Sequence, residues 1–463
     1  MSMPRLLRNL QLIALLLIIG CTENKKIITP EKVAIVNGVA ITRQELVNRI
    51  ELTLLPGFSK LKGRNKRVLD ILIDELVVSQ WAEREGLTAA PDYKDALDFI
   101  TQQALIRELF LEKFRKRSEP DSEQINQAIQ KSIQQLLIQT LFTENQAIAE
   151  KWSQSIDSGK TFNELVEESE NNPFIHINNS SFQWGDGTVP LEIENIAYQL
   201  KLGESSDLLH LNNVFIIFTI KSIIRDVILT EYSYSLKRHS VKKVLQARTE
   251  SRLANEYVDR LLTHLKITQR ANGFLEVSRY IEEKLSNSSE ILVYNSPVIG
   301  EEIHSPLDYN LELVVVETPD FTWTGKDVLS IIRRYNYKFK TKRPEDLRNN
   351  LKRFLKAAVR DHYLSKRAKL LGLESNKRVR KDSQEWARYF LYLKGVTIFA
   401  ERDTALTNRG MMADKIMEVR RYANISINHN LLETIELTGI PTLVYWNSDI
   451  ARQLAVPPLM EFR

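Results

Sequence analysis

The sequence predicts a mainly α-helical protein with one inserted α+β domain. Before residue 121 and after residue 319, apolar residues recur at helical spacing. Between residues 136 and 220, short strand-like and helical stretches alternate, as in a small α+β domain. The chain has 463 residues, which is too long for one ordinary core, so several domains are expected. With 43% hydrophobic and 27% charged residues, the composition is that of a globular protein.

Residues 31–121 form the first helical domain of this prediction. A strand-like stretch turns at Asn37-Gly38, a pair that favours tight hairpins. Thr42 then caps a helix, with Glu45 three residues further on. Gly86 ends the second helix, because glycine readily adopts the left-handed conformation at a helix end. Three helices are predicted, over residues 43–55, 67–85 and 93–117.

Residues 122–225 carry the α+β pattern. The predicted elements are a strand at 136–142, helices at 144–158 and 162–168, a polar loop at 169–181, a helix at 191–200 and a strand at 214–220. A helical return segment (226–275) and a strand-containing connector (276–318) follow.

Residues 319–463 form a second, basic helical module that echoes the first. Thr324 occupies the place of Thr42, and a helix ends at Gly372 as another ends at Gly86. Further helices are predicted at 326–334, 344–371 and 382–393. We interpret this as a possible duplication in which only the first copy is interrupted by the α+β domain; the alternative is chance similarity in where helices start and stop.

The first residues have the order of a secretory signal. Arg5 and Arg8 precede the apolar run 10–19, which is too short to span a membrane as a finished helix. The tetrad ending in Gly20-Cys21 resembles the bacterial lipobox, in which the cysteine is acylated after the signal is removed. A short buried apolar segment with a chance cysteine is the alternative. Lipidation at Cys21 predicts a signal peptide at 1–20 and a tether at 21–30.

Few other residues suggest chemistry. Cys21 is the only cysteine, so disulfides, thiol catalysis and cysteine-based metal sites are excluded. The seven histidines have no metal-ligand spacing, and no phosphate-binding or serine-hydrolase motif occurs. We therefore expect no metal and no cofactor, and export disfavours nucleic acid as a partner.

A basic block lies between Arg333 and Lys381. It contains 18 lysines and arginines and four acidic residues, which gives a net charge of +14. One interpretation is attraction to an anionic lipid surface. The alternative is a solvated helix face, with leucine, phenylalanine and alanine on the buried side. The candidate lipid-facing residues are Arg333, Arg334, Lys352, Arg353 and Lys356.

Two stretches resemble the SurA, PrsA and PpiD group of extracytoplasmic folding factors. Residues 33–87 share the opening V-A-x-V-N-G-x-x-I-T-x-x-E-L and a helix that closes on A-x-x-x-G-L. Residues 137–223 resemble the parvulin domain, a peptidyl-prolyl isomerase, that such proteins carry. The matching residues there are Gly159, Thr161-Phe162, Leu165, Trp184, Val189-Pro190, Tyr198, Leu200 and Gly203-Glu204.

The parvulin-like stretch departs from its family at both histidines. Gln139 stands at the first histidine position and Phe215 at the second. Phenylalanine neither donates nor accepts a hydrogen bond, so the paired-imidazole network of an active parvulin is absent. Prolyl isomerisation has a barrier of about 20 kcal/mol, and we expect weak or no activity. The candidate peptide pocket, with core packing as the alternative role, comprises Gln139, Phe182, Trp184, Tyr198 and Phe215.

The resemblance implies a lipid-anchored periplasmic chaperone that binds unfolded or nascent exported polypeptides, possibly those of the outer membrane. Thr22 after the cysteine favours the periplasmic face of the outer membrane if the source is Gram-negative. Two alternatives stay open: an active parvulin-type isomerase that uses other residues, and a structural or assembly lipoprotein with one fixed partner.

Overall fold

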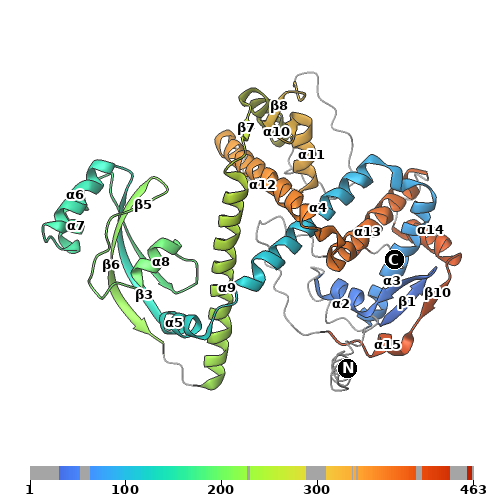
Figure 1. Ribbon diagram of the computed structural model, residues 1–463, viewed down its shortest axis with the longest axis horizontal. Coiled ribbons are helices and arrows are strands. Elements are labelled where there is room, and N and C mark those ends of the chain that lie inside the picture. Colours follow the sequence, from blue (N-terminus) through green and yellow to red (C-terminus); the bar gives the residue numbers. More distant parts are fainter. Residues whose placement is uncertain are drawn as a thin grey trace, which may run out of the picture. The chain divides into compact units, whose positions relative to one another are not determined.

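The computed structural model describes residues 31–52, 63–226, 230–287, 309–335, 337–339, 343–402, 409–437 and 456–460. These residues are mainly helical and form three small antiparallel sheets, which confirms the predicted fold class. They divide into two compact units (Figure 1). Of the described residues, the first unit holds those between 31 and 105, between 267 and 365, and from 369 onward, and the second holds those between 106 and 266 and residues 366–368. Cys21, the signal and the tether lie outside the described residues.

The first unit begins with a hairpin and three helices. Asn37 and Gly38 turn the hairpin with positive φ angles of 47° and 86°. The Thr42 hydroxyl accepts a hydrogen bond from the Glu45 amide at 3.1 Å and so caps the first helix. Gly86, at φ 77°, follows the second helix. The elements are β1 (Lys32–Val36), β2 (Val39–Thr42), α2 (Arg43–Leu52), α3 (Arg64–Arg84), the 3₁₀ turn η2 (Leu87–Ala89) and α4 (Pro91–Lys113).

The same order of elements recurs in the second half of the chain. Thr324 caps a helix in a reciprocal pair of hydrogen bonds with Asp327. Gly372, at φ 73°, follows the next helix as Gly86 does in the first half. The elements are β8 (Val314–Glu317), β9 (Thr322–Thr324), α11 (Gly325–Arg334), α12 (Pro344–Leu370), the 3₁₀ turn η4 (Leu373–Ser375) and α13 (Lys377–Arg402). We call the two sets the first repeat and the second repeat.

The two repeats exchange strands. β10 (Ile425–Ile427), which follows the second repeat, pairs with β1 of the first repeat, giving the sheet order β10-β1-β2. β7 (Thr268–Gln269), which follows the first repeat, pairs with β8 of the second, giving β7-β8-β9. Each hairpin therefore receives its third strand from the chain that follows the other repeat.

The third helices are exchanged as well. α13 of the second repeat packs against α3 of the first, where Gly395 meets Val78 and the Phe399 ring lies 4.5 Å from Trp81. α4 of the first repeat brings Phe99 within 4.8 Å of Tyr335, which caps α11 of the second. The remaining helices of this unit are α10 (Ala271–Asn287), α14 (Arg409–Arg421) and α15 (His429–Glu433).

The second unit is built on one four-stranded antiparallel sheet in the order β4-β3-β6-β5. α8 covers a core on one face, around Phe182 and Phe218, while α6 and α7 cover the other, around Trp152 and Phe162 (Figure 1). The bounds are β3 (Gln134–Thr143), α6 (Gln146–Asp157), α7 (Phe162–Ser169), β4 (His176–Gln183), α8 (Leu191–Ala197), β5 (Leu209–Leu211) and β6 (Val214–Arg225).

The expected polar loop at 169–181 is partly wrong, because β4 forms there. Half of its residues are asparagine or serine, which give little strand signal, and mainly Phe182 enters the core. An edge strand pairs on one side only, so backbone hydrogen bonds to β3 over eight consecutive residue pairs hold it despite its polar side chains.

Two further helices complete the second unit. α5 (Ser122–Ser132) packs against α9 (Glu231–Leu262), a helix of 32 residues. Ile125, Ala128 and Ile129 meet Val241 in a small core with Trp184 and Leu245 at its margin. Most of α9 outside this core is exposed or half-buried, since only Val241 and Glu250 are fully buried along it.

Candidate functional site

The structure separates the two positions at which the parvulin histidines are replaced. Gln139 on β3 lies opposite Thr219 of β6, whereas Phe215 lies opposite Thr143. The two residues are thus four positions apart along the ladder, or about 13 Å at the usual rise of a strand. They do not face one another across the sheet.

Phe215 instead belongs to an aromatic pair at one end of the sheet. It stacks on His210 of β5, with ring centroids 4.5 Å apart and planes inclined by 13°. Phe142 stacks similarly on His176 of β4 at 5.0 Å. Each of these exposed imidazoles packs against a phenyl ring rather than against another titratable group.

Phe182 and Tyr198 contribute to the core beneath α8. Phe182 is 1% exposed and meets the Tyr198 ring edge-on at 6.1 Å. The Tyr198 hydroxyl donates a hydrogen bond to the Gln134 carbonyl at 2.7 Å. Burial raises the pKa of Tyr198 to about 12, so its hydroxyl stays protonated and serves as a structural donor.

Trp184 faces α9. The Arg248 guanidinium of α9 lies 4.5 Å from the centre of its ring. The same guanidinium pairs at 2.7 Å with Glu194 of α8, a carboxylate that also accepts the Gly185 amide at 2.8 Å. Glu194 is 1% exposed while the Arg248 side chain is 26% exposed, so a buried carboxylate and a partly solvated guanidinium link α8 to α9. The five pocket candidates therefore lie in different surroundings; their role in peptide binding stays a prediction.

A groove that the sequence did not indicate lies between α6 and α7. It has a volume of about 420 Å³, with Trp152, Leu165 and Ile175 at its base and Lys151 and Glu168 at its rim. Its residues come from two helices and the loop after them, and the local pattern shows only that each helix has an apolar face. Because it is wide and shallow, the groove suits a surface ligand better than a sequestered reaction.

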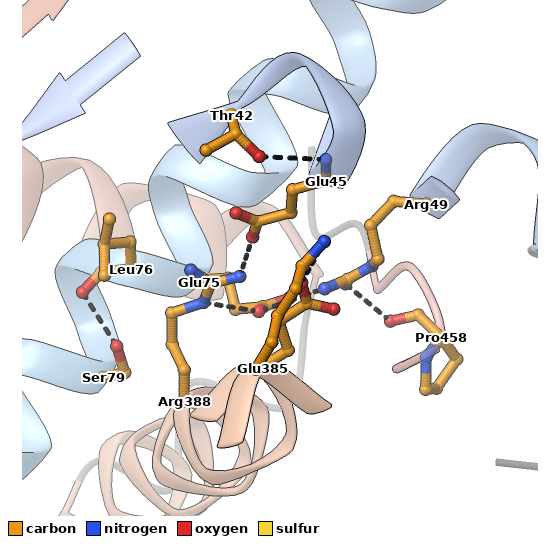
Figure 2. A network of polar contacts seen from close by, with 10 residues as sticks. Thr42, Glu45, Arg49, Glu75, Leu76, Ser79, Glu385, Arg388 and Pro458 are labelled. Atoms are coloured by element: carbon orange, nitrogen blue, oxygen red, sulfur yellow. Dashed lines mark hydrogen bonds and ion pairs between the residues drawn. The ribbon is translucent and has the colours of Figure 1, made fainter. Parts of the chain in front are cut away.

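The first unit contains a buried ionic cluster, which Figure 2 shows from close by. Arg49 of α2 is fully buried and donates to both oxygens of Glu75 of α3, at 3.2 and 2.6 Å. Arg388 of α13 also donates to Glu75, at 3.1 Å, and pairs with Glu45 of α2. A third carboxylate, Glu385, lies 3.6 Å from Lys381. The cluster thus joins α2 and α3 of the first repeat to α13 of the second.

Two carboxylates of the cluster have pKa values shifted in opposite directions. Burial raises the pKa of Glu75, but the positive charges of Arg49 and Arg388 outweigh it and leave that pKa below its ordinary value. Burial, reinforced by the charge of Glu45, raises the pKa of Glu385. The arrangement holds Glu75 ionised and makes Glu385 the acid of the cluster that protonates more readily.

The second repeat has a buried carboxylate of its own. Asp361 of α12 is 5% exposed, accepts a hydrogen bond from the Tyr335 hydroxyl at 3.1 Å and pairs with Arg360 at 2.7 Å. Burial raises the pKa of Asp361, and the charge of Arg360 offsets this only in part. Burial also raises the pKa of Tyr335.

The five basic residues proposed to contact lipid differ in how exposed their side chains are. Lys352, Arg353 and Lys356 point outward on α12, opposite the buried Leu351, Phe354 and Leu355, as a solvated helix face requires. Lys352 also lies 5.8 Å from the Phe274 ring. Arg333 and Arg334 are half-buried at the end of α11. Binding of these residues to anionic lipid stays a prediction.

Among the described residues there is neither a helix suited to span a membrane nor a cluster of metal ligands. None of the helices described is long and apolar enough to cross a membrane. Within the same ranges, no group of three or more histidine, cysteine or acidic residues is placed to hold a metal ion.

Comparison with known proteins gives faint structural likeness alone. No family model matches the chain, and no curated protein matches it. Solved structures of PrsA are similar to parts of it. The peptidylprolyl isomerase PrsA of Bacillus anthracis is 14% identical over 42% of this chain and 96% of its own, with a TM-score of 0.22. The foldase PrsA of Streptococcus pneumoniae is 13% identical over 46% and 84%, with a TM-score of 0.19. PrsA of Bacillus subtilis is 17% identical over 51% and 93%, with a TM-score of 0.16. At these values, function has to be argued from the residues of this chain.

Proposed function

We propose that this protein is an exported, membrane-anchored chaperone that holds unfolded exported polypeptides, and that its sheet domain binds without catalysing prolyl isomerisation. The proposal joins the export and lipidation signals at the start of the sequence to an exposed apolar surface on the second unit. Shielding apolar segments from aggregation requires no catalytic group.

The observation that carries the proposal is the exposure of large apolar side chains on the second unit. Tyr232 and Leu236 lie one helical turn apart at the start of α9 and are 74% and 54% exposed. Ile224, at the end of β6, is 58% exposed, and Phe174 and Leu202 are 64% and 63% exposed. Of these, Tyr232 and Leu236 are neighbours on one helix face, and adjacent exposed apolar side chains of this kind are candidates for contact with another polypeptide.

The surroundings of the pocket candidates favour a binding role for the sheet domain over proline isomerisation. Catalysis at a barrier of about 20 kcal/mol requires converging polar groups around a twisted imide. Here Gln139 and Phe215 are four ladder positions apart, and Arg248 stacks on Trp184. The domain supports a binding role more readily than a catalytic one.

The test is suppression of aggregation of several unrelated unfolded proteins. We expect the wild-type chain to slow aggregation of each client and Tyr232→Ser with Leu236→Ser to reduce this several-fold. The matched control is Tyr422→Ser with Leu370→Ser, which removes a tyrosine and a leucine that are 86% and 70% exposed on the first unit. Protection of one client alone would instead support an assembly protein with a fixed partner.

A protease-coupled proline assay tests the remaining part of the proposal. We expect no acceleration above the uncatalysed rate, and turnover near that of an active parvulin would contradict the binding-only role. The anchor is tested by Cys21→Ser, which should move the protein from the membrane fraction to the soluble periplasmic fraction and abolish labelling by radioactive palmitate.

A further inference from the structure

An extended stretch of the chain, Val456–Met460, lies against the first repeat. It forms neither helix nor strand. The Pro458 carbonyl accepts a hydrogen bond from Arg49 Nη2 at 3.2 Å, across a separation of 409 residues in sequence (Figure 2). We call Val456–Met460 the docked segment.

Arg49 is well prepared to bind a backbone carbonyl. Its side chain is fully buried, and its two bonds to Glu75 fix the guanidinium plane. Its Nε has no hydrogen-bond partner among the described residues, which is costly for a buried donor. A hydrogen bond from Arg49 to a main-chain carbonyl depends on the course of the peptide backbone and not on its side chains. This contact can therefore form with polypeptides of many sequences.

Apolar contacts follow on the same segment. Leu459 packs against the core of β1, β2, α2 and α3, and Pro457 is buried. Met460 forms part of the wall of a cavity of about 220 Å³ that Ile71, Tyr392 and Ile416 also line. This volume is below that of sites for drug-sized molecules, roughly 300–1,000 Å³. Its size suits a single side chain better than a small-molecule ligand.

The acidic residues at this cavity do not make it a cation site. Asp70 and Asp74 line it, but Arg420 of α14 pairs with them at 2.9 and 2.6 Å. Both carboxylates are therefore engaged by a guanidinium of the protein, and Lys66 and Arg67 add positive charge to the same lining. The surface that remains for a peptide is the carbonyl-binding guanidinium of Arg49 with the apolar residues beside it.

We propose that Arg49 and the adjoining cavity form a binding site for an extended, proline-containing apolar polypeptide segment, and that the docked segment occupies this site as a tethered competitor. The docked segment has the sequence Val-Pro-Pro-Leu-Met, so the site accommodates proline and large apolar side chains. Proline suits it, because proline has no N–H that needs a partner and favours the extended conformation. This inference rests on the proposed chaperone function and assigns that function a second site, on the first unit.

The experiment measures binding of a fluorescent peptide with the sequence of residues 455–462, AVPPLMEF, by anisotropy. The full chain is compared with Leu459→Asp combined with Met460→Asp, which expels the segment without deleting it. A tethered competitor acts at an effective concentration of order millimolar. We therefore expect the double variant to bind the peptide at least tenfold more tightly than the wild type.

The matched control is Leu370→Asp with Leu371→Asp, two adjacent leucines that are 70% and 37% exposed in the same unit, and it should bind the peptide as weakly as the wild type. If the double variant fails to fold, a protease site inserted between residues 438 and 455 releases the segment from the folded wild-type chain. Absence of peptide binding to the opened protein, or equal binding to the opened and closed forms, would overturn the inference.

The same preparations separate this inference from the proposed function. Aggregation suppression without peptide binding leaves the chaperone and removes the site. Peptide binding without suppression of any client keeps the site as a peptide-binding surface and removes the chaperone.

Discussion

The two repeats bury a carboxylate at the same place and neutralise it differently. Glu75 and Asp361 each lie eleven residues before the left-handed glycine that follows their helix, Gly86 or Gly372. Glu75 is held by two arginines, which lower its pKa, whereas Asp361 has a tyrosine hydroxyl and one arginine, and its pKa is raised. Counted from the capping threonines, the position of Arg49 in the first repeat is that of Ile331 in the second.

The comparison shows that position alone does not determine what a buried acid contributes. In the first repeat the acid completes an ion network that ties α2, α3 and α13 together. In the second, burial favours the protonated form of the acid. The unfolding of acid variants and its pH dependence test this difference directly. Substitutions at Gly395 and on the outer face of α12 test the packing and the surface of the helices concerned.

Removing each acid should have unequal effects. Glu75→Gln leaves Arg49 and Arg388 buried with too little negative charge, and we expect a loss of about 3–5 kcal/mol in the free energy of unfolding. Asp361→Asn keeps a hydrogen-bond acceptor for Tyr335, and we expect about 1 kcal/mol. Urea unfolding of both variants measures the difference between the two losses in the free energy of unfolding. Equal losses would mean that the two arginines around Glu75 do not increase the cost of removing a buried acid.

Gly395 tests whether α13 belongs structurally to the first repeat. A Cβ at this position would lie 2.6 Å from Val78 Cγ1 of α3. Gly395→Val should therefore destabilise the first unit by about 1–3 kcal/mol. Adding Val78→Ala should recover part of the loss in a double-mutant cycle, because it removes the clashing methyl groups. Simple additivity of the two losses would contradict this packing.

The dependence on pH should have opposite sign in the two repeats. The folded-state pKa of Glu75 is lowered, so its stabilisation is present above the unfolded pKa of about 4.3 and is lost as the pH falls through and below that value. The cost of Glu75→Gln should therefore shrink on acidification.

Asp361 should behave in the reverse way. Its folded-state pKa is raised, so ionised Asp361 destabilises the fold once the pH exceeds the unfolded value of about 3.9. The cost of Asp361→Asn should grow as the pH falls. Thermal unfolding of both variants and the wild type between about pH 2.5 and pH 7.5 covers both titrations and gives the two slopes, and slopes of the same sign would refute the assignment.

The smallest effect on stability is expected on the outer face of α12. Lys352→Gln, Arg353→Gln and Lys356→Gln change exposed side chains opposite the buried stripe. The free energy of unfolding should change by less than about 0.5 kcal/mol. Binding to vesicles that contain anionic lipid should fall, while binding to neutral vesicles stays unchanged. Equal binding of the triple variant and the wild type would assign this face to solubility alone.

Much of the local structure could be predicted from the sequence. Thr42, Thr324, Gly86 and Gly372 mark helix boundaries through contacts within a few residues, and such signals survive any tertiary arrangement. Most of the longer helices and the strands β3 and β6 also follow from their apolar periodicity, whereas α5, α10, α14 and α15 were not predicted. β4 escaped prediction, because an edge strand held by its backbone needs no apolar pattern.

The candidate site was predicted less well. The sequence indicated that Gln139 and Phe215 replace histidines, but their separation depends on the strand register, which is set by the pairing of β3 with β6. Trp184 resembled a pocket residue, yet Arg248, more than sixty residues away in sequence, stacks on it. The sequence around Glu75 did not indicate an ion network, because the arginines that pair with Glu75 lie on α2 and α13, distant in sequence.

By itself the sequence determined most of the longer helices, the caps at Thr42 and Thr324, the mainly helical class with one α+β domain, and the resemblance on which the expected chaperone role rests. Only the tertiary structure decided that the two repeats exchange strands and third helices, and that Pro458 meets Arg49. The physical reason is the separation in sequence of the residues that interact. Caps and periodicity depend on interactions within a few residues, whereas strand exchange and buried ion pairs depend on which distant segments together exclude water.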